Sequence, residues 1–192
     1  MRITVVGMGK IGLPLAVQFA RKQNSVVGAD INPEVVQLIN AGEEPFPNEA
    51  HFAEYLLAEV SSGRLRATTD TPGAVRKSDV VVVVVPLFVD EKARPDFQAM
   101  DAATRSIAQG LKPGTLVSYE TTLPVGTTRT RLAPLLEEGS GMVAGRDFFV
   151  VFSPERVLTG RVFADLRRYP KLVGGIDQGS EKSGIDFYTE VL

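Results

Sequence analysis

The chain has 192 residues, of which 44% are hydrophobic and 23% are charged, and its formal net charge at pH 7 is −2. These values are ordinary for a soluble globular domain and give no electrostatic reason to expect nucleic acid or an anionic membrane as a partner. The absence of cysteine excludes disulfides, thiolate metal sites and a cysteine nucleophile within these residues, and we expect no metal site.

The apolar segments are short. The longest purely aliphatic run, residues 80–85, is far too short to span a bilayer. The N-terminus leads directly into a predicted strand and lacks the charged start and cleavage site of a signal peptide. We therefore expect a cytoplasmic protein.

The chain opens with a predicted strand at residues 2–6, a glycine-rich turn and a predicted helix at residues 11–21. Gly7 permits the sharp exit from the strand, Gly9 lets main-chain N–H groups approach a phosphate, and Gly12 allows the helix to pack closely on the strand. A pyrophosphate would lie at the N-terminus of this helix, where unpaired N–H groups and the helix dipole favour negative charge. The pattern predicts a dinucleotide-binding turn.

Asp30 closes the next apolar run, 18 residues after Gly12. A carboxylate at this position can accept both hydroxyls of a ribose and would repel a 2′-phosphate, so the prediction is NAD rather than NADP. The alternative is a glycine-rich turn of another α/β protein, such as an S-adenosylmethionine site.

Apolar runs alternate with helical patterns along most of the chain. Further strands are predicted at residues 26–29, 80–85, 115–119 and 148–152, with a short one near residues 65–68, and further helices at residues 33–41, 49–61, 97–109 and 127–138. The continuous valine run is typical of a strand covered on both faces. The alternation predicts an α/β fold, a Rossmann-like, doubly wound, mostly parallel sheet with helices on both faces.

Ligands of such sheets bind outside the carboxyl ends of the strands. Five polar or glycine-rich segments begin where an apolar run stops, and they start at Gly7, Asp30, Pro86, Glu120 and Ser153. We expect these segments to meet at one edge of the sheet. Pro86 and Pro95 should keep their loop free of helix until Asp96, which is a candidate N-cap for the next helix.

Several residues of these loops have both a functional and a structural interpretation. The hydroxyls of Thr121 and Thr122 can serve a nicotinamide, a ribose or a substrate, or cap the turn before the next helix. Glu155 can act as a base, orient a water molecule or form a salt bridge. Arg156 and Arg161 can bind a phosphate or a sugar carbonyl, or pair with Glu155.

Taken together, the loops resemble the UDP-glucose/GDP-mannose dehydrogenase family, specifically its N-terminal NAD-binding domain. The resemblance lies in GMGKIGLP, in ADIN after the second strand, in ETTLPVGTT, in SPERVLTG and in KLVGG near the end. It covers residues 1–175, and several separate motifs occur in the same order as in the family. The form PERVL followed by glycine is similar to UDP-N-acetylmannosamine dehydrogenases more than to UDP-glucose dehydrogenases.

The resemblance implies two successive NAD-dependent oxidations of a sugar C6 alcohol to the carboxylate. It implies catalytic roles for Thr122 and Glu155 and substrate contacts from Glu155, Arg156 and Val157. The cofactor contacts that it implies come from Gly7, Gly9, Lys10, Ile11, Gly12, Asp30, Pro86, Thr121 and Thr122. The implied partner is a UDP-sugar, with a UDP-N-acetylhexosamine as the expected substrate, and the complete enzyme is expected to be a homodimer.

Four departures from the family pattern stand out. Leu87 and Phe88 replace the T-P of the family's V-P-T-P, Val35 replaces a common basic residue, and Thr159 replaces a second glutamate of the UDP-glucose enzymes. The family also uses a cysteine, located after this domain, to form a thiohemiacetal and then a thioester. We therefore expect residues 1–178 to be the NAD-binding domain and residues 179–192 to start a truncated connecting helix, with the fragment alone inactive.

Two other functions stay open. The 3-hydroxyacid and 6-phosphogluconate dehydrogenases share the opening glycine pattern and a threonine or serine pair after a later strand, but usually lack a PERV-like segment. A non-enzymatic, NAD-responsive binding module would explain the missing nucleophile without truncation.

Overall fold

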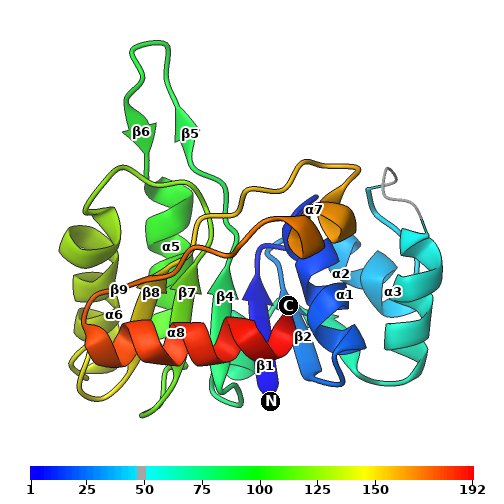
Figure 1. Ribbon diagram of the computed structural model, residues 1–192, viewed down its shortest axis with the longest axis horizontal. Helices are drawn as coiled ribbons and strands as arrows, with labels where there is room; N and C mark the ends of the chain where they lie inside the picture. Colours follow the sequence, from blue (N-terminus) through cyan, green and yellow to red (C-terminus); the bar gives the residue numbers. More distant parts are fainter. Residues whose placement is uncertain (47–50) are drawn as a thin grey trace.

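Figure 1 shows a computed structural model of the chain, which describes residues 1–46 and 51–192. Its centre is a seven-stranded sheet in the order β3-β2-β1-β4-β7-β8-β9. The strands are β1 (Arg2–Val6), β2 (Ser25–Ala29), β3 (Leu65–Thr68), β4 (Val80–Val83), β7 (Leu116–Tyr119), β8 (Phe149–Phe152) and β9 (Gly174–Gly175). All neighbours pair in parallel except β8 and β9, which are antiparallel. The predicted fold class is confirmed.

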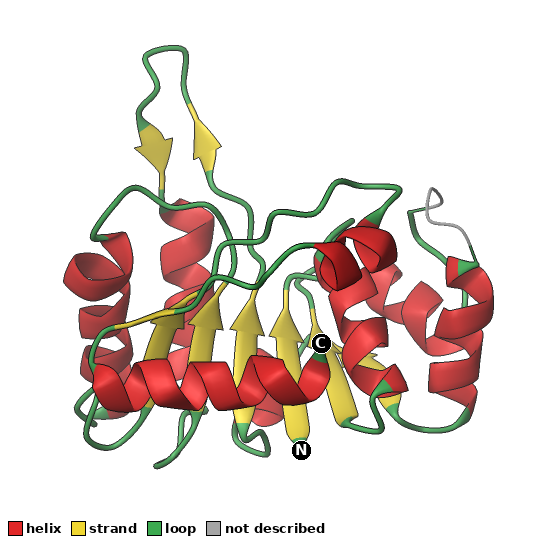
Figure 2. Ribbon diagram, viewed as in Figure 1, coloured by secondary structure: helices red, strands yellow, loops and turns green. Residues whose placement is uncertain are grey.

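Helices cover both faces of this sheet (Figure 2). They are α1 (Gly12–Arg21), α2 (Pro33–Ala41), α3 (Phe52–Ser61), α4 (Thr71–Val75), α5 (Gln98–Ala108), a π-helical turn η1 (Thr128–Leu132) that runs into α6 (Ala133–Ser140), α7 (Val162–Arg168) and α8 (Gln178–Val191). Within the described residues, no helix combines the length and apolar character needed to cross a membrane.

The valine run of β4 lies between two hydrophobic cores formed by the described residues. Val80 and Val82 lie in one core with side chains of α1 and α8, whereas Val81 and Val83 lie in the other with side chains of α5 and α6. Successive side chains of a strand point to opposite faces, so a strand buried on both faces needs an apolar residue at every position. Helix α8 lies along the front of the sheet in Figure 1, with Phe187, Tyr188 and Val191 buried.

The structure corrects several predicted elements. The strand at 80–85 ends at Val83, and the helix at 127–138 begins as a π-helical turn and extends to Ser140. The connecting helix expected within residues 179–192 begins at Gln178, after Asp177, whose side chain accepts the Ser180 amide. The first two residues of the helix predicted at 49–61 lie outside the described residues.

Five elements were not predicted. The short helices α4 and α7 and the two-residue strand β9 fall in segments interpreted as loops, and β5 (Phe88–Val89) pairs with β6 (Pro95–Asp96) in a hairpin that projects beyond the sheet (Figure 1). The prediction that Asp96 is an N-cap was wrong in position, because the N-cap of α5 is Phe97. Asp96 lies in β6, and its carboxylate still accepts the Gln98 amide over 2.9 Å.

Candidate active site at the carboxyl edge of the sheet

The predicted loops do meet at one edge of the sheet, outside the carboxyl ends of β1, β2, β4, β7 and β8 (Figure 2). The chain order reverses between β1 and β4, which is the position where open α/β sheets bind their ligands. At this point a β-carbon on Gly7 would lie 3.0 Å from the carbonyl oxygen of Val84. The glycine turn therefore lies directly against the end of β4.

The three glycines of the turn have different surroundings. Gly7 has a φ of +92°, which disfavours other residues, and its amide donates to the Ala29 carbonyl over 2.8 Å. A β-carbon on Gly12 would lie only 1.9 Å from the Gly7 carbonyl oxygen, whereas one on Gly9 would meet no atom within 4 Å. Gly7 and Gly12 are thus required by the protein's own packing, while Gly9 leaves open space beside the backbone.

Among the described residues, no side chain offsets the positive end of the dipole of helix α1. Its N-cap position, Ile11, makes no side-chain capping hydrogen bond, and its first turn contains no acidic residue. The first-turn N–H groups of a helix have no partner within the helix. Together with the open space at Gly9 and the exposed Lys10, this turn fits an anionic pyrophosphate.

Asp30 connects the end of β2 to the glycine turn. Its Oδ2 accepts the Met8 amide over 2.7 Å and its Oδ1 accepts the Asn32 amide over 2.9 Å. Each carboxylate oxygen has a second lone pair, so both can still accept a ribose hydroxyl. The next residue, Ile31, is 94% exposed and offers an apolar surface beside the carboxylate.

The loops after β4 and β7 are joined through Thr121, whose hydroxyl donates to the Val85 carbonyl over 2.6 Å. Thr122, the next residue, is exposed, as is Pro86. The two threonines therefore differ: Thr121 holds two loops together, whereas Thr122 is exposed.

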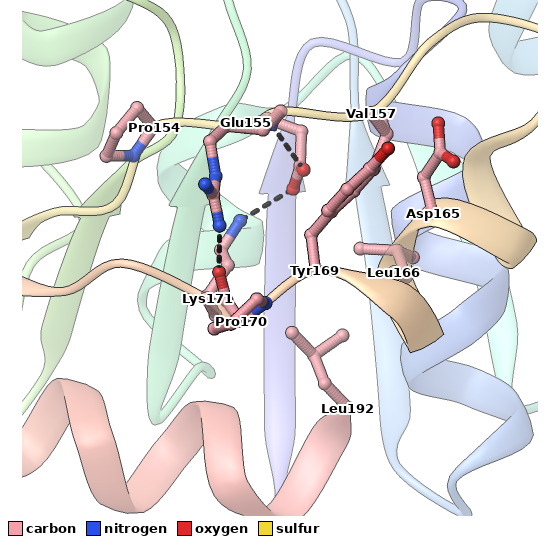
Figure 3. Close-up of a pocket in the computed structure, with 10 residues that line it drawn as sticks. Pro154, Glu155, Val157, Asp165, Leu166, Tyr169, Pro170, Lys171 and Leu192 are labelled. Atoms are coloured by element: carbon pink, nitrogen blue, oxygen red, sulfur yellow. Dashed lines mark hydrogen bonds and ion pairs between the residues drawn. The ribbon is translucent and has the colours of Figure 1, made fainter.

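Glu155 lies in the loop after β8, beside the threonine loop. Its amide donates to the Glu120 carbonyl over 2.9 Å. Its Oε1 accepts the Arg156 amide over 2.7 Å, and its Oε2 accepts from Lys171 Nζ over 2.6 Å (Figure 3). The side chain is only 11% exposed. Burial would raise the pKa of Glu155, but the Lys171 ammonium and these hydrogen bonds hold it below its usual range. Glu155 is thus an ionised carboxylate that can accept a proton or orient a water molecule.

The two arginines near Glu155 have other partners. The Arg156 guanidinium donates to the Pro170 carbonyl, and Arg161 pairs with Asp165 over 2.8 Å. The suggested pairing of either arginine side chain with Glu155 is therefore wrong. Val157 lines the same hollow as Glu155, together with Tyr169 and Leu192 (Figure 3).

A second hollow connects this loop with the glycine turn. It is lined by Gly9, Lys10, Leu13, Pro14, Phe46, Phe52 and Thr159. Thr159 belongs to the segment that follows Glu155, so the loop after β8 extends across the edge of the sheet to the start of α1. The described residues contain no group of three or more histidine, aspartate or glutamate side chains placed to hold a metal ion.

Sequence reasoning missed three participants. Lys171, Glu120 and Tyr188 form a buried network with Glu155, in which Lys171 also donates to Glu120 over 2.6 Å and Tyr188 donates to Glu120 over 2.7 Å. A carboxylate directly after the apolar run of β7 was a signal for Glu120. Lys171 opens the KLVGG segment of the family resemblance, which assigned it no role, and nothing in the spacing indicated Tyr188.

The fold and the glycine turn define a Rossmann-type dinucleotide-binding domain. The whole chain, residues 1–192, matches the model of the UDP-glucose/GDP-mannose dehydrogenase family, NAD binding domain. The chain belongs to this family, as its NAD-binding domain, which confirms the resemblance stated from the loops.

Individual relatives agree with this assignment. The UDP-N-acetyl-D-mannosamine dehydrogenase of Pyrococcus horikoshii is 38% identical over 180 residues, covering 93% of this chain and 42% of the relative. A solved structure of a UDP-D-ManNAc dehydrogenase from Pyrococcus horikoshii superposes with a TM-score of 0.94 at 34% identity, covering 100% of this chain and 45% of the other. The solved structure of an NDP-N-acetyl-D-galactosaminuronic acid dehydrogenase from Methanosarcina mazei superposes with a TM-score of 0.93 at 35% identity, covering 99% of this chain and 42% of the other. The chain thus spans less than half the length of these relatives.

Proposed function

We propose that this chain is the NAD-binding domain of a nucleotide-sugar 6-dehydrogenase that oxidises the C6 alcohol of a UDP-N-acetylhexosamine, namely UDP-N-acetylmannosamine, to the uronic acid. The relatives named above are dehydrogenases of N-acetylated nucleotide sugars by name, and the PERVL segment resembles that of the mannosamine enzymes. Thr159, at the position of the second glutamate of UDP-glucose enzymes, argues against glucose.

We assign the cofactor residues along this edge of the sheet. The turn from Gly7 to Gly12, including Lys10 and Ile11, would hold the pyrophosphate, and Asp30 the adenosine ribose. Pro86, Thr121 and Thr122 would lie at the nicotinamide half, because Thr121 joins the loops after β4 and β7. NAD supplies a hydride acceptor when it is bound.

The chain's own contribution to the chemistry centres on Glu155. Each oxidation of the C6 carbon removes a hydride and a proton, and the second consumes a water molecule. We assign Glu155 to hold the proton or orient the water, with Thr122 beside the reacting groups and Arg156 and Val157 at the sugar. The observation that carries this assignment is the mostly buried Glu155 carboxylate, bound to Lys171, on the same sheet edge as the glycine turn.

Calorimetric titration tests the cofactor assignment on the 192 residues directly. We expect NAD to bind with a micromolar to millimolar Kd and no UDP-sugar to be oxidised, because no cysteine is present to act as the nucleophile. Absence of NAD binding would refute the cofactor assignment, and NADH production by these residues alone would refute the requirement for a cysteine.

The substrate assignment can be tested on a chimera in which these residues replace the matching part of the Pyrococcus horikoshii relative. We expect the chimera to reduce NAD with UDP-N-acetylmannosamine and not with UDP-glucose or a 3-hydroxyacid, and Glu155→Gln to abolish turnover while NAD binding persists. A chimera that binds NAD but oxidises only a hydroxyacid would contradict the proposal. We also infer a cytoplasmic homodimer for the complete protein, to be checked by light scattering.

A further inference from the structure

Lys171 lies between two carboxylates. Its Nζ is 2.6 Å from Oε2 of Glu120 and 2.6 Å from Oε2 of Glu155. The lysine side chain is 11% exposed and that of Glu120 is fully buried. An ammonium group in such surroundings is stable only with charged partners at hydrogen-bond distance. Both partners are present, and Lys171 has little freedom to turn toward solvent.

The network extends to a third element of the fold. Oε1 of Glu120 accepts from the hydroxyl of Tyr188, which is itself 2.6 Å from the Ser118 hydroxyl. Lys171 Nζ also lies 5.0 Å from the centre of the Tyr188 ring. Ser118 belongs to β7 and Tyr188 to α8, so the far side of the network is fixed by the core of the domain.

The Glu155 end of the network faces the open edge. Glu155 lines the hollow of Figure 3, while Glu120 has no exposed side-chain surface. We propose that Lys171 is a positioning residue for Glu155, and that Glu120, held by Tyr188, is the buried anchor that fixes Lys171. The proposal rests on the catalytic role proposed for Glu155.

The other charges around Glu155 leave Lys171 as its principal cation. Arg156 contributes its amide to Glu155, but its guanidinium is turned to the Pro170 carbonyl. Asp165, which lines the same hollow, is paired with Arg161. Tyr169 and the C-terminal residue Leu192 also line it. Burial would raise the pKa of Glu155, and Lys171 is the main group that lowers it. The net lowering of this pKa agrees with the arrangement.

Carboxyl NMR of the ¹³C-glutamate-labelled chain tests the proposal without reference to activity. In Lys171→Met, the titration midpoint of Glu155 should rise by about one pH unit or more, because its cationic partner is lost. Lys182→Met is the matched control, since it removes a lysine whose pair with Asp186 is exposed on α8. A Glu155 midpoint that is the same in Lys171→Met and wild type would overturn the positioning role.

Variants of Glu120 test the anchor, and they keep the proposal testable if Lys171→Met does not fold. Glu120→Gln retains an oxygen that can accept from Lys171, whereas Glu120→Ala does not. We expect the ¹⁵N signal of the Lys171 ammonium to persist in Glu120→Gln and to be lost through solvent exchange in Glu120→Ala. A signal that is equally protected in both variants would contradict the anchoring role.

Kinetics in the chimera separate this proposal from the proposed function. Lys171→Met should lower kcat with little change in the KM for NAD and move the acid limb of the kcat profile to higher pH, and Lys171→Arg should restore part of the activity. If Glu155→Gln is fully active, the catalytic role proposed for Glu155 fails even where the NMR shift is observed. If Glu155→Gln is inactive but Lys171→Met leaves kcat and the pH profile unchanged, only the positioning role fails.

Discussion

A β-carbon on Gly12 would lie 1.9 Å from the carbonyl oxygen of Gly7, although the two glycines are five positions apart along the chain. This distance is far inside van der Waals contact, and the opposing atom is backbone, which cannot rotate away. The close approach places the first turn of α1 against the end of β1. Gly9, between them, borders open space instead.

Substitution by alanine should therefore separate folding from cofactor binding. Gly12→Ala should lower the thermal midpoint by several degrees and abolish NAD binding, because helix and strand must move apart. Gly9→Ala should leave the thermal midpoint within about one degree of wild type, since small surface changes cost little stability. It should weaken NAD binding at least about tenfold, because the methyl group occupies the space of the phosphates. Differential scanning fluorimetry and calorimetry measure the two effects. A Gly9→Ala variant that binds NAD normally would show that the phosphates lie elsewhere.

Asp30 should control both the affinity for NAD and the discrimination against NADP. We expect Asp30→Ala to weaken NAD binding about tenfold or more, because hydrogen bonds to a charged group are lost. The variant should also show a smaller preference for NAD over NADP. Asp30→Asn keeps an acceptor for the Met8 amide, so it should preserve the thermal midpoint better than Asp30→Ala. Titrations of both cofactors measure the preference, and an unchanged preference in Asp30→Ala would contradict the ribose assignment.

The two adjacent threonines should respond differently to loss of the hydroxyl. Thr121→Val removes the hydrogen bond to the Val85 carbonyl and should destabilise the domain by about 1 kcal/mol, seen as a shift of the urea midpoint. Thr122→Val should leave that midpoint unchanged and impair turnover in the chimera. The reverse pattern would exchange the roles assigned to the two side chains.

Glu120 should make the domain less stable as the pH rises from about 5 to about 7. Burial raises the pKa of Glu120 to about 7, with Lys171 opposing the rise and Glu155 adding to it, against an ordinary value of 4.5. Between these two values the folded state binds more protons than the unfolded state, so stability decreases with increasing pH. Glu120→Gln removes this titration, so the urea midpoint of the variant should rise relative to that of wild type as the pH increases over that range. A constant difference between the two proteins from pH 5 to 8 would argue that Glu120 does not titrate there.

The parts of the site that could be predicted from the sequence are those made by one contiguous segment. The strand, the glycine turn, α1 and Asp30 follow each other within thirty residues, and each leaves a local pattern of periodicity or residue type. The order of the loops along one sheet edge followed from the parallel fold, since parallel strands bring their carboxyl ends to one side.

The network around Glu155 could not be predicted in this way. Lys171 is 16 residues from Glu155 and 51 from Glu120, and Tyr188 is 68 from Glu120. These side chains meet only because α8 packs back across the sheet and the segment before β9 returns beside β8. The short helices α4 and α7 were missed because elements of five and seven residues are too short for a periodic pattern.

The π-helical turn Thr128–Leu132 has a consequence for insertions and deletions. Its wider hydrogen-bonded ring accommodates one more residue per turn than an α-helix does. Removing one residue within it would tighten the turn to α-helical geometry while keeping the buried side of α6, including Leu136, directed at the sheet. A one-residue gap in alignments with other dehydrogenases is therefore best placed at this turn, where the length of the chain can change without rotating the helix that follows.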